Sequence, residues 1–264
     1  MKKAFNFIIL FSIAALSAGA VSMASDGFES GFRSSVSPIS IPNTHLIGQG
    51  QGKVLRGKAP QNEKEVAELV KYGITDVVIF KNDTRGEVAT EQKLLLDQNL
   101  KPSRVVTIPF RWKEFGSFEE ACVQTVEAMK HLKYVESKPG RGVFFHCTVG
   151  EDRTGYLAGL YRMLYAKNAW DMKRAFDDEL CARGYEAGNP KKPQHVVDAI
   201  RQELTPLFMK MAYKIETGEM KGEALTRKIC RKDPANEAAF RDNPRYRAEN
   251  YVCRKSPNYA LNTH

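Results

Sequence analysis

Residues 142–155 read GVFFHCTVGEDRTG, and this stretch decides the fold of the chain. Gly142 to Phe145 form an apolar run with the length of a buried strand. A short loop from His146 to Arg153 follows, and an apolar-striped helix is expected over residues 154–166. This order makes an anion site, because backbone N–H groups and the positive end of the helix dipole point into the loop.

The loop contains a cysteine and an arginine at a spacing that suits phosphate chemistry. Five residues separate Cys147 from Arg153, enough for the loop to close over a tetrahedral phosphate with the sulfur beneath phosphorus. The guanidinium can then donate to two phosphate oxygens, and the positive field favours thiolate over thiol. We expect His146 to orient the loop and support this ionisation, and Thr154 to offer its hydroxyl to the sulfur. The remaining loop residues are expected to bind substrate: Thr148, Val149, Gly150 and Glu151.

Strand and helix patterns alternate before this loop. Strands are predicted at 53–56, 74–80 and 104–108, and helices at 62–70, 87–98 and 117–132. Helices at 154–166, 169–183 and 194–215 follow the loop. The pattern predicts an α/β fold with a central, mostly parallel sheet flanked by helices. In such sheets the ligand lies beyond the carboxyl ends of the strands.

The N-terminus has the pattern of an export signal. Lys2 and Lys3 precede an apolar run over residues 4–21, and Ser22-Met23-Ala24 is a small-x-small cleavage site. This apolar run is short for a transmembrane anchor, and small and polar residues interrupt it. We therefore predict a signal peptide at 1–24, a flexible lead-in at 25–48, a catalytic domain at 49–215 and a basic extension at 216–264. The mature protein is expected to be periplasmic or secreted from a bacterium, without stable membrane insertion.

Charge and cysteine content set further expectations. The net charge of +9 becomes +7 when Lys2 and Lys3 are removed, since residues 1–24 contain no acid. The basic extension either attracts anionic partners or is a solvated tail; we expect a phosphorylated substrate and no nucleic acid. Five cysteines in an oxidising compartment predict two bridges and one free thiol. Cys147 is the expected free thiol, and Cys230 with Cys253 the expected pair. No metal-ligand spacing is present, and we expect no cofactor.

His146-Cys147, five further residues and Arg153-Thr154 resemble the His-Cys-x5-Arg-Ser/Thr loop of the protein tyrosine phosphatase superfamily. The resemblance extends less sharply over residues 50–200. Residues 170–184 look like the helix that follows the loop in the compact dual-specificity members. The resemblance implies a tyrosine-phosphatase-like fold and a phosphoric monoester hydrolase that works through a phosphocysteine intermediate.

The general acid is not where most members of the family carry it, because residues 109–116 contain no aspartate. Asp152 resembles the Asp-Arg pair of myotubularins and of certain secreted bacterial phosphatases that accept phosphoinositides. Repulsion by a bound phosphate would favour its protonated form. Glu114 is the second candidate. We expect Glu151 to face outward, since two inward carboxylates would repel the substrate. Gln194 lies where classical members orient the hydrolytic water, or is a plain helix-start residue.

Basic residues after the strands predict a substrate with several phosphates. They are Lys81, Arg85, Arg111, Lys113, Lys191 and Lys192. This resembles the cysteine phytases, so we place inositol polyphosphate (phytate) ahead of phosphotyrosine, dual-specificity or phosphoinositide substrates. A catalytically silent phospholigand-binding module and a rhodanese, which also presents a cysteine in an anion loop, are the alternatives from other classes.

Overall fold

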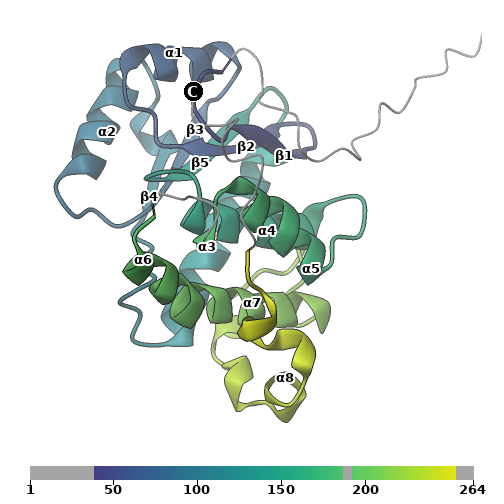
Figure 1. The fold of residues 1–264 in the computed structure, drawn as a ribbon. Helices are drawn as coiled ribbons and strands as arrows, with labels where there is room; N and C mark the ends of the chain where they lie inside the picture. The colour runs from purple at the N-terminus through teal and green to yellow at the C-terminus, as the bar shows by residue number, and fades with distance from the viewer. Residues whose placement is uncertain (1–38, 187–191, 254–264) are drawn as a thin grey trace, which may run out of the picture. The chain divides into compact units, whose positions relative to one another are not determined.

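The computed structural model describes residues 39–186 and 192–253. The predicted signal peptide, residues 25–38 of the lead-in, and Lys191 lie outside this part of the chain. The described residues contain one five-stranded sheet in the order β1-β2-β5-β3-β4 (Figure 1). β1 runs antiparallel to β2, and the other neighbours are parallel. The predicted α/β fold with a mostly parallel sheet is confirmed.

The strand that leads to the cysteine loop lies in the middle of the sheet. The strands are β1 (His45–Gln49), β2 (Lys53–Lys58), β3 (Asp76–Phe80), β4 (Val105–Ile108) and β5 (Gly142–Cys147). β5 pairs with β2 on one side and β3 on the other and is buried along its whole length. Cys147 therefore emerges at the carboxyl edge with strands on both sides.

Helices cover both faces of the sheet (Figure 1). On one face lie α1 (Glu63–Lys71) and α2 (Glu87–Asp97); on the other lie α3 (Phe118–Glu136), α4 (Asp152–Tyr165) and α7 (Thr205–Glu216). The shorter helices are α5 (Met172–Ala175), α6 (Gln194–Ala199) and α8 (Ala238–Arg241). The predicted helix starts hold: the Asn62 and Ser117 side chains accept from the backbone N–H groups of Glu65 (3.0 Å) and Glu120 (3.2 Å). The two long helices predicted after α4 are each interrupted by a π-helical turn, Phe176–Leu180 and Ile200–Leu204.

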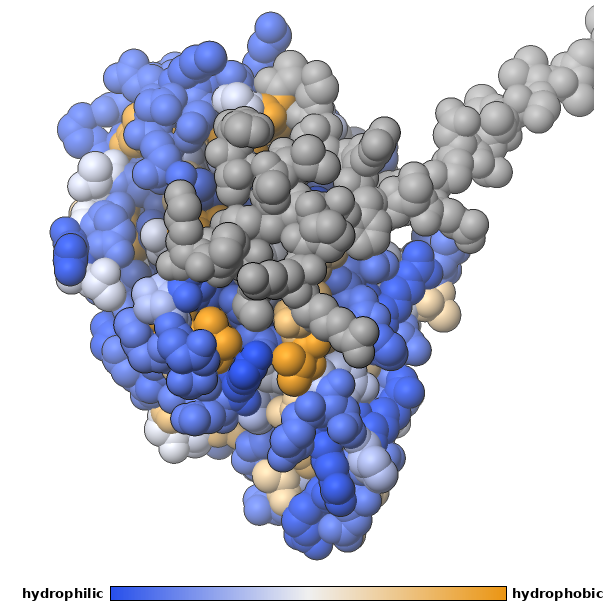
Figure 2. Space-filling model, viewed as in Figure 1, coloured by the Kyte–Doolittle hydropathy of each residue, from blue (hydrophilic) through white to orange (hydrophobic). Residues whose placement is uncertain are grey.

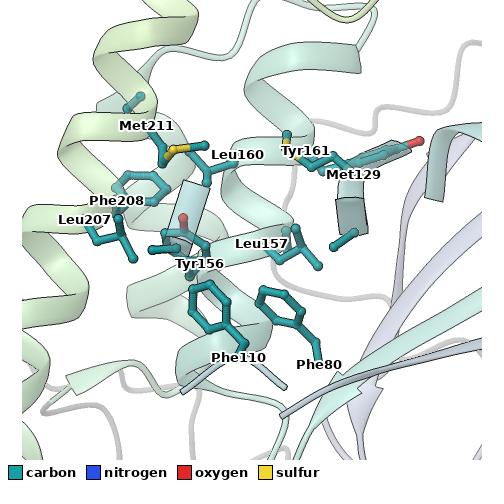
Figure 3. Close-up of a cluster of buried hydrophobic side chains, with 14 of the residues drawn as sticks. Phe80, Phe110, Met129, Tyr156, Leu157, Leu160, Tyr161, Leu207, Phe208 and Met211 are labelled. Carbon is teal, nitrogen blue, oxygen red and sulfur yellow. The ribbon is translucent and has the colours of Figure 1, made fainter. Parts of the chain in front are cut away.

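An aromatic core fixes the position of α4. Phe80 at the end of β3 stacks on Phe110 with ring centroids 4.3 Å apart, and Phe110 lies 5.3 Å from Tyr156 of α4. Leu157 and Leu160 add apolar contacts from the same helix (Figure 3). Each such buried side chain contributes about 1.5–3 kcal/mol relative to exposure. The helix whose first turn completes the cysteine loop is therefore rigidly placed.

Order begins earlier in the chain than the sequence predicted. The lead-in was expected to reach residue 48, but β1 begins at His45. Ile39 and Ile41 are already buried in the core that α1 covers. The proline, serine and asparagine residues of this segment interrupt its apolar residues, so that no regular hydrophobic pattern is visible in the sequence. Order in this segment comes instead from the hydrogen bonds between β1 and β2. The prediction of a flexible segment is wrong from Ile39 onward.

Two disulfides attach the basic extension to the rest of the described chain. The prediction of two bridges and a free Cys147 is confirmed, but the predicted pair Cys230–Cys253 is wrong. Cys230 is bonded to Cys122 of α3, and Cys253 is bonded to Cys181, just after the π-helical turn Phe176–Leu180. The bonded cysteines are 108 and 72 residues apart, so each bridge closes a long loop and constrains the unfolded chain strongly.

Figure 2 shows one face of the molecule, on which the described residues are largely hydrophilic, with small hydrophobic patches between them. No helix within 39–186 and 192–253 has the length and apolar character needed to cross a bilayer. The same residues contain no cluster of three or more His, Cys, Asp or Glu side chains that could hold a metal ion.

Candidate active site

Cys147 ends the central strand and lies at the bottom of the loop. Cys147 is 2% exposed, and its backbone N–H donates to the Thr154 hydroxyl oxygen at 2.8 Å. Burial alone would raise the pKa of the Cys147 thiol, but the positive charge of Arg153 and hydrogen bonds to Thr154 outweigh it and lower the pKa. The side chain is therefore set up to react as a thiolate.

The Arg153 guanidinium is held across the loop by two side chains. One terminal nitrogen, Nη1, donates to Asn82 Oδ1 at 2.8 Å, and the other, Nη2, donates to the Thr148 hydroxyl at 3.3 Å. Asn82 comes from the loop after β3, two residues beyond Phe80. A guanidinium held in this way is ready to donate to an anion in the loop.

Gly150 sits where only glycine fits. Its φ is +75°, and a Cβ at this position would lie 2.5 Å from the carbonyl oxygen of Gly57. Its own carbonyl oxygen accepts from Arg56 Nη2 at 2.8 Å and from Asn43 Nδ2 at 2.7 Å. The loop therefore packs directly on the end of β2 and is fixed there by two donors.

A buried charge network stands behind this contact. Arg56 is fully buried and donates from Nη1 to the backbone oxygen and to Oε2 of Glu179 at 2.5 and 3.1 Å. Glu179 also contacts Nε2 of His45 at 2.9 Å and Nε of Arg162 at 3.0 Å. Burial opposes the charge of Glu179, but His45, Arg162 and Arg56 together hold its pKa well below the usual range. Glu179 is thus the common anion that places Arg56 under Gly150.

His45 takes part in this network as a neutral ring. Burial is the main reason that the pKa of His45 falls to about 4. At neutral pH its contact with Glu179 is therefore a hydrogen bond donated by the uncharged imidazole rather than an ion pair.

A second buried network lies beneath the loop on the α2 side. His146 Nε2 lies 2.8 Å from Oε1 of Glu91 on α2, and its Nδ1 lies 3.0 Å from the Cys147 carbonyl oxygen. Glu91 Oε2 in turn lies 2.9 Å from the Lys81 ammonium nitrogen. Burial would raise the pKa of Glu91, but His146 and Lys81 outweigh burial and lower it. Lys81 is only 3% exposed, so the expectation that it binds substrate at the rim is wrong; its charge balances Glu91 instead.

The two carboxylates of the loop share one buried lysine. The Lys192 ammonium nitrogen lies 2.6 Å from Asp152 Oδ1 and 3.2 Å from Glu151 Oε2, and it donates to the Gly184 carbonyl oxygen at 3.0 Å. Burial would lower the pKa of Lys192, but the two carboxylates outweigh burial and raise it. Glu151 is 4% exposed, so the expectation that it faces outward is wrong. Lys192 neutralises the negative charge that would otherwise repel an anionic substrate, and it is not a free rim residue.

The outer rim is more open. Glu114 and Arg111 lie 3.7 Å apart on the loop after β4, with side chains 62% and 58% exposed. The Lys113 ammonium lies 5.0 Å from the centre of the Trp112 ring. Arg85, after β3, is exposed, as are Thr148 and Val149 of the cysteine loop. Gln194 begins α6 and donates its side-chain amide to Asp198 at 2.8 Å, within the same helix.

Comparison with known proteins identifies this loop. Residues 50–168, which include both Cys147 and Arg153, match the model of the tyrosine phosphatase family. This segment of the chain belongs to the protein tyrosine phosphatase superfamily. Members of that family are cysteine phosphatases, which hydrolyse phosphoric monoesters.

Solved structures of phosphatases resemble the chain at low identity. Pseudomonas aeruginosa TpbA is 22% identical with a TM-score of 0.42, covering 67% of this chain and 98% of that one. TpbA in complex with phosphotyrosine is 21% identical with a TM-score of 0.36, covering 48% of this chain and 66% of that one, just under two thirds. The catalytic core of SIW14 from Saccharomyces cerevisiae, a PP-IP phosphatase, is 16% identical with a TM-score of 0.38, covering 52% and 73%. No curated protein matches the chain.

Several residues that shape the phosphatase loop were missed by the sequence analysis. Arg56, Asn82 and Glu91 were assigned no role, and Glu179 was included only as part of the segment 170–184 that resembles the family. Arg56 did leave a signal, since a lone arginine inside an apolar strand needs a buried counter-charge. Asn82 and Glu91 left none beyond their places after β3 and on α2.

Proposed function

We propose that this phosphatase is an exported enzyme that hydrolyses inositol polyphosphates through a phosphocysteine intermediate. The observation that carries the proposal is the buried Cys147 thiol, whose pKa is lowered by Arg153 and Thr154 at the N-terminus of α4. A thiolate there needs no separate base, and the loop amides and helix dipole favour a phosphate above it.

The reaction has two steps. The Cys147 thiolate attacks phosphorus, so that an S–P bond forms and the ester P–O bond breaks, and the leaving oxygen takes a proton from a general acid. Arg153 donates to two phosphate oxygens as their charge develops. Water then attacks phosphorus, the S–P bond breaks and the thiolate returns with its hydrogen bond to Thr154. The deprotonated acid takes the proton lost by the water.

Asp152 is the proposed general acid. It lies beside Arg153 in the first turn of α4, and Lys192 holds its side chain, only 14% exposed, against the loop. Glu114 projects into solvent beside Arg111. Of the two candidate carboxyl groups, Asp152 is therefore the one held against the cysteine loop.

Asp152→Asn should therefore lower kcat most for substrates with a poor leaving group. For an inositol phosphate we expect a loss of about 10²- to 10⁴-fold, the usual contribution of a general acid. For an aryl phosphate with an acidic phenol the loss should be smaller, because that leaving group needs little protonation. Steady-state kinetics on both substrates measures the difference. Glu114→Gln is the matched control, and a leaving-group-dependent loss in that variant instead would transfer the role to Glu114.

Basic side chains on the carboxyl edge support a substrate with several phosphates. Arg85 follows β3, and Arg111 and Lys113 follow β4, on the same edge as Cys147. Lys81 and Lys192 are not part of this basic rim, because each is paired with a buried carboxylate. The rim therefore contains fewer basic side chains than the sequence predicted. The two disulfides support export, since such bonds persist in oxidising compartments.

The test is phosphate release from inositol hexakisphosphate and from a phosphotyrosine peptide by the protein lacking residues 1–24. A mild reductant keeps Cys147 active, and Cys147→Ser serves as the blank. Release from the inositol alone supports the proposal, and release from the peptide alone moves the enzyme to phosphoprotein substrates. Phosphate binding without turnover of either substrate would favour a binding module. Sulfur transfer from thiosulfate would favour a rhodanese.

A further inference from the structure

Lys58 lies directly beside the nucleophile at the carboxyl edge of the sheet. In the parallel pairing of β2 with β5, Lys58 is opposite Cys147. Residues paired in this way point to the same face of a sheet. The pairing shows this elsewhere: Val54 and Val143 both enter the core under α4, and Leu55 and Phe144 both enter the opposite core. Lys58 and Cys147 therefore project from the same face.

The backbone around Lys58 is fixed against the cysteine loop. A Cβ on Gly150 would lie 2.6 Å from the Lys58 nitrogen, so the loop packs on this peptide without a gap. The Lys58 N–H donates to the Pro42 carbonyl oxygen at 3.0 Å, and the N–H of Ala59 donates to the Thr148 carbonyl oxygen at 3.4 Å. The base of the Lys58 side chain is thus held at the border of the phosphate site.

Within the described part of the chain, no carboxylate pairs with the Lys58 ammonium, whereas the nearby buried lysines each have such a partner. Lys81 is bound by Glu91, and Lys192 by Asp152 and Glu151. The ammonium of Lys58, on a half-buried residue, makes no hydrogen bond or ion pair with any other residue in 39–186 or 192–253. An ammonium group on a flexible stem binds phosphate as a point charge, without the fixed geometry that arginine requires.

We propose that Lys58 binds a second phosphate group of the substrate, next to the one being hydrolysed, and so determines specificity for multiply phosphorylated substrates. The proposal rests on the proposed function. The hydrolysed phosphate is already served by the loop amides and Arg153, whereas Lys58 belongs to β2, outside the loop. Lys58 lies at the edge of the site that holds the hydrolysed phosphate, so a neighbouring phosphate group on the same substrate would be the anion nearest to it.

Binding to the inactive Cys147→Ser protein tests the role of Lys58 separately from turnover. Calorimetry gives the Kd of inositol hexakisphosphate and of inorganic phosphate for this protein with and without Lys58→Met. We expect Lys58→Met to raise the Kd of inositol hexakisphosphate by about tenfold, which is the size of one charge-assisted hydrogen bond. The Kd of inorganic phosphate should rise by less than about twofold. Failure of the wild type to hydrolyse the inositol would refute the proposed function without altering this comparison.

Lys101→Met is the matched control, because Lys101 is an exposed lysine just before β4, at the amino edge of the sheet. It should leave both Kd values within about twofold, since a distant exposed charge is screened. Lys58→Arg, which keeps the charge, should retain most of the inositol affinity and covers the case in which Lys58→Met does not fold. The proposal would be overturned if Lys58→Met raised the Kd of both anions equally, or left the Kd of inositol hexakisphosphate unchanged.

Discussion

Cys147→Ser should stop phosphate release while leaving phosphate binding nearly intact. A serine hydroxyl does not ionise near neutral pH, whereas the pKa of the Cys147 thiol is lowered by Arg153 and Thr154. We expect kcat to fall by at least about 10⁴-fold, the scale seen when an enzyme loses its nucleophile. The Arg153 contacts to Asn82 and Thr148 do not involve the sulfur, so the anion site should survive.

Phosphate release and calorimetric binding of inorganic phosphate measure the two halves of this prediction. Arg153→Met is the contrasting variant: it should lose binding as well as turnover, because the guanidinium contacts the anion itself. Activity above about one per cent in Cys147→Ser would mean that another group attacks phosphorus.

The parts of the site that lie next to one another in sequence could be predicted. The strand Gly142–Cys147, the loop and the first turn of α4 are continuous, and their chemistry follows from order and spacing alone. The capped starts of α1 and α3 were predicted for the same reason, since a cap and its partner are three residues apart.

The partners of buried charges could not be predicted in this way. Arg56 and Glu179 are 123 residues apart, and the 108 residues between Cys122 and Cys230 gave no hint of their bond. A hydrophobic pattern shows which face of a helix or strand is buried. It does not show which oppositely charged side chain will pair with a buried charged side chain. Lys81 was therefore assigned to the rim, although a carboxylate ten residues later, on α2, holds it inside.

The Glu179 network links the loop to the extension of the chain. Glu179 lies in the π-helical turn Phe176–Leu180, and Cys181, which is bonded to Cys253, follows two residues later. Through Arg56, the same carboxylate supports the Gly150 carbonyl in the loop. The disulfide and the ion pairs therefore restrain one short segment from two sides, and the shape of the loop depends on that segment.

Glu179→Ala should accordingly cost both stability and activity. It leaves the buried guanidinium groups of Arg56 and Arg162 without their common counter-ion, a loss of about 3–5 kcal/mol in the free energy of unfolding. Arg56 also loses the partner that places it under Gly150, so kcat should fall although Glu179 is not a catalytic residue. Denaturant unfolding and steady-state kinetics measure the two effects, and Glu179→Gln, which retains the shape and some hydrogen bonds, should be milder in both.

Glu127→Ala is the matched control for the loss of an ion pair. Glu127 pairs with Arg227 at the surface, where the side chains are 40% and 75% exposed, and such pairs contribute at most about 1 kcal/mol. If Glu179→Ala were no more destabilising than Glu127→Ala, water would have to reach Arg56 and Arg162 in the variant, and the buried network would not be what holds the loop. A variant that is destabilised but keeps full kcat would separate the two roles, because Gly150 would then keep its position without Arg56.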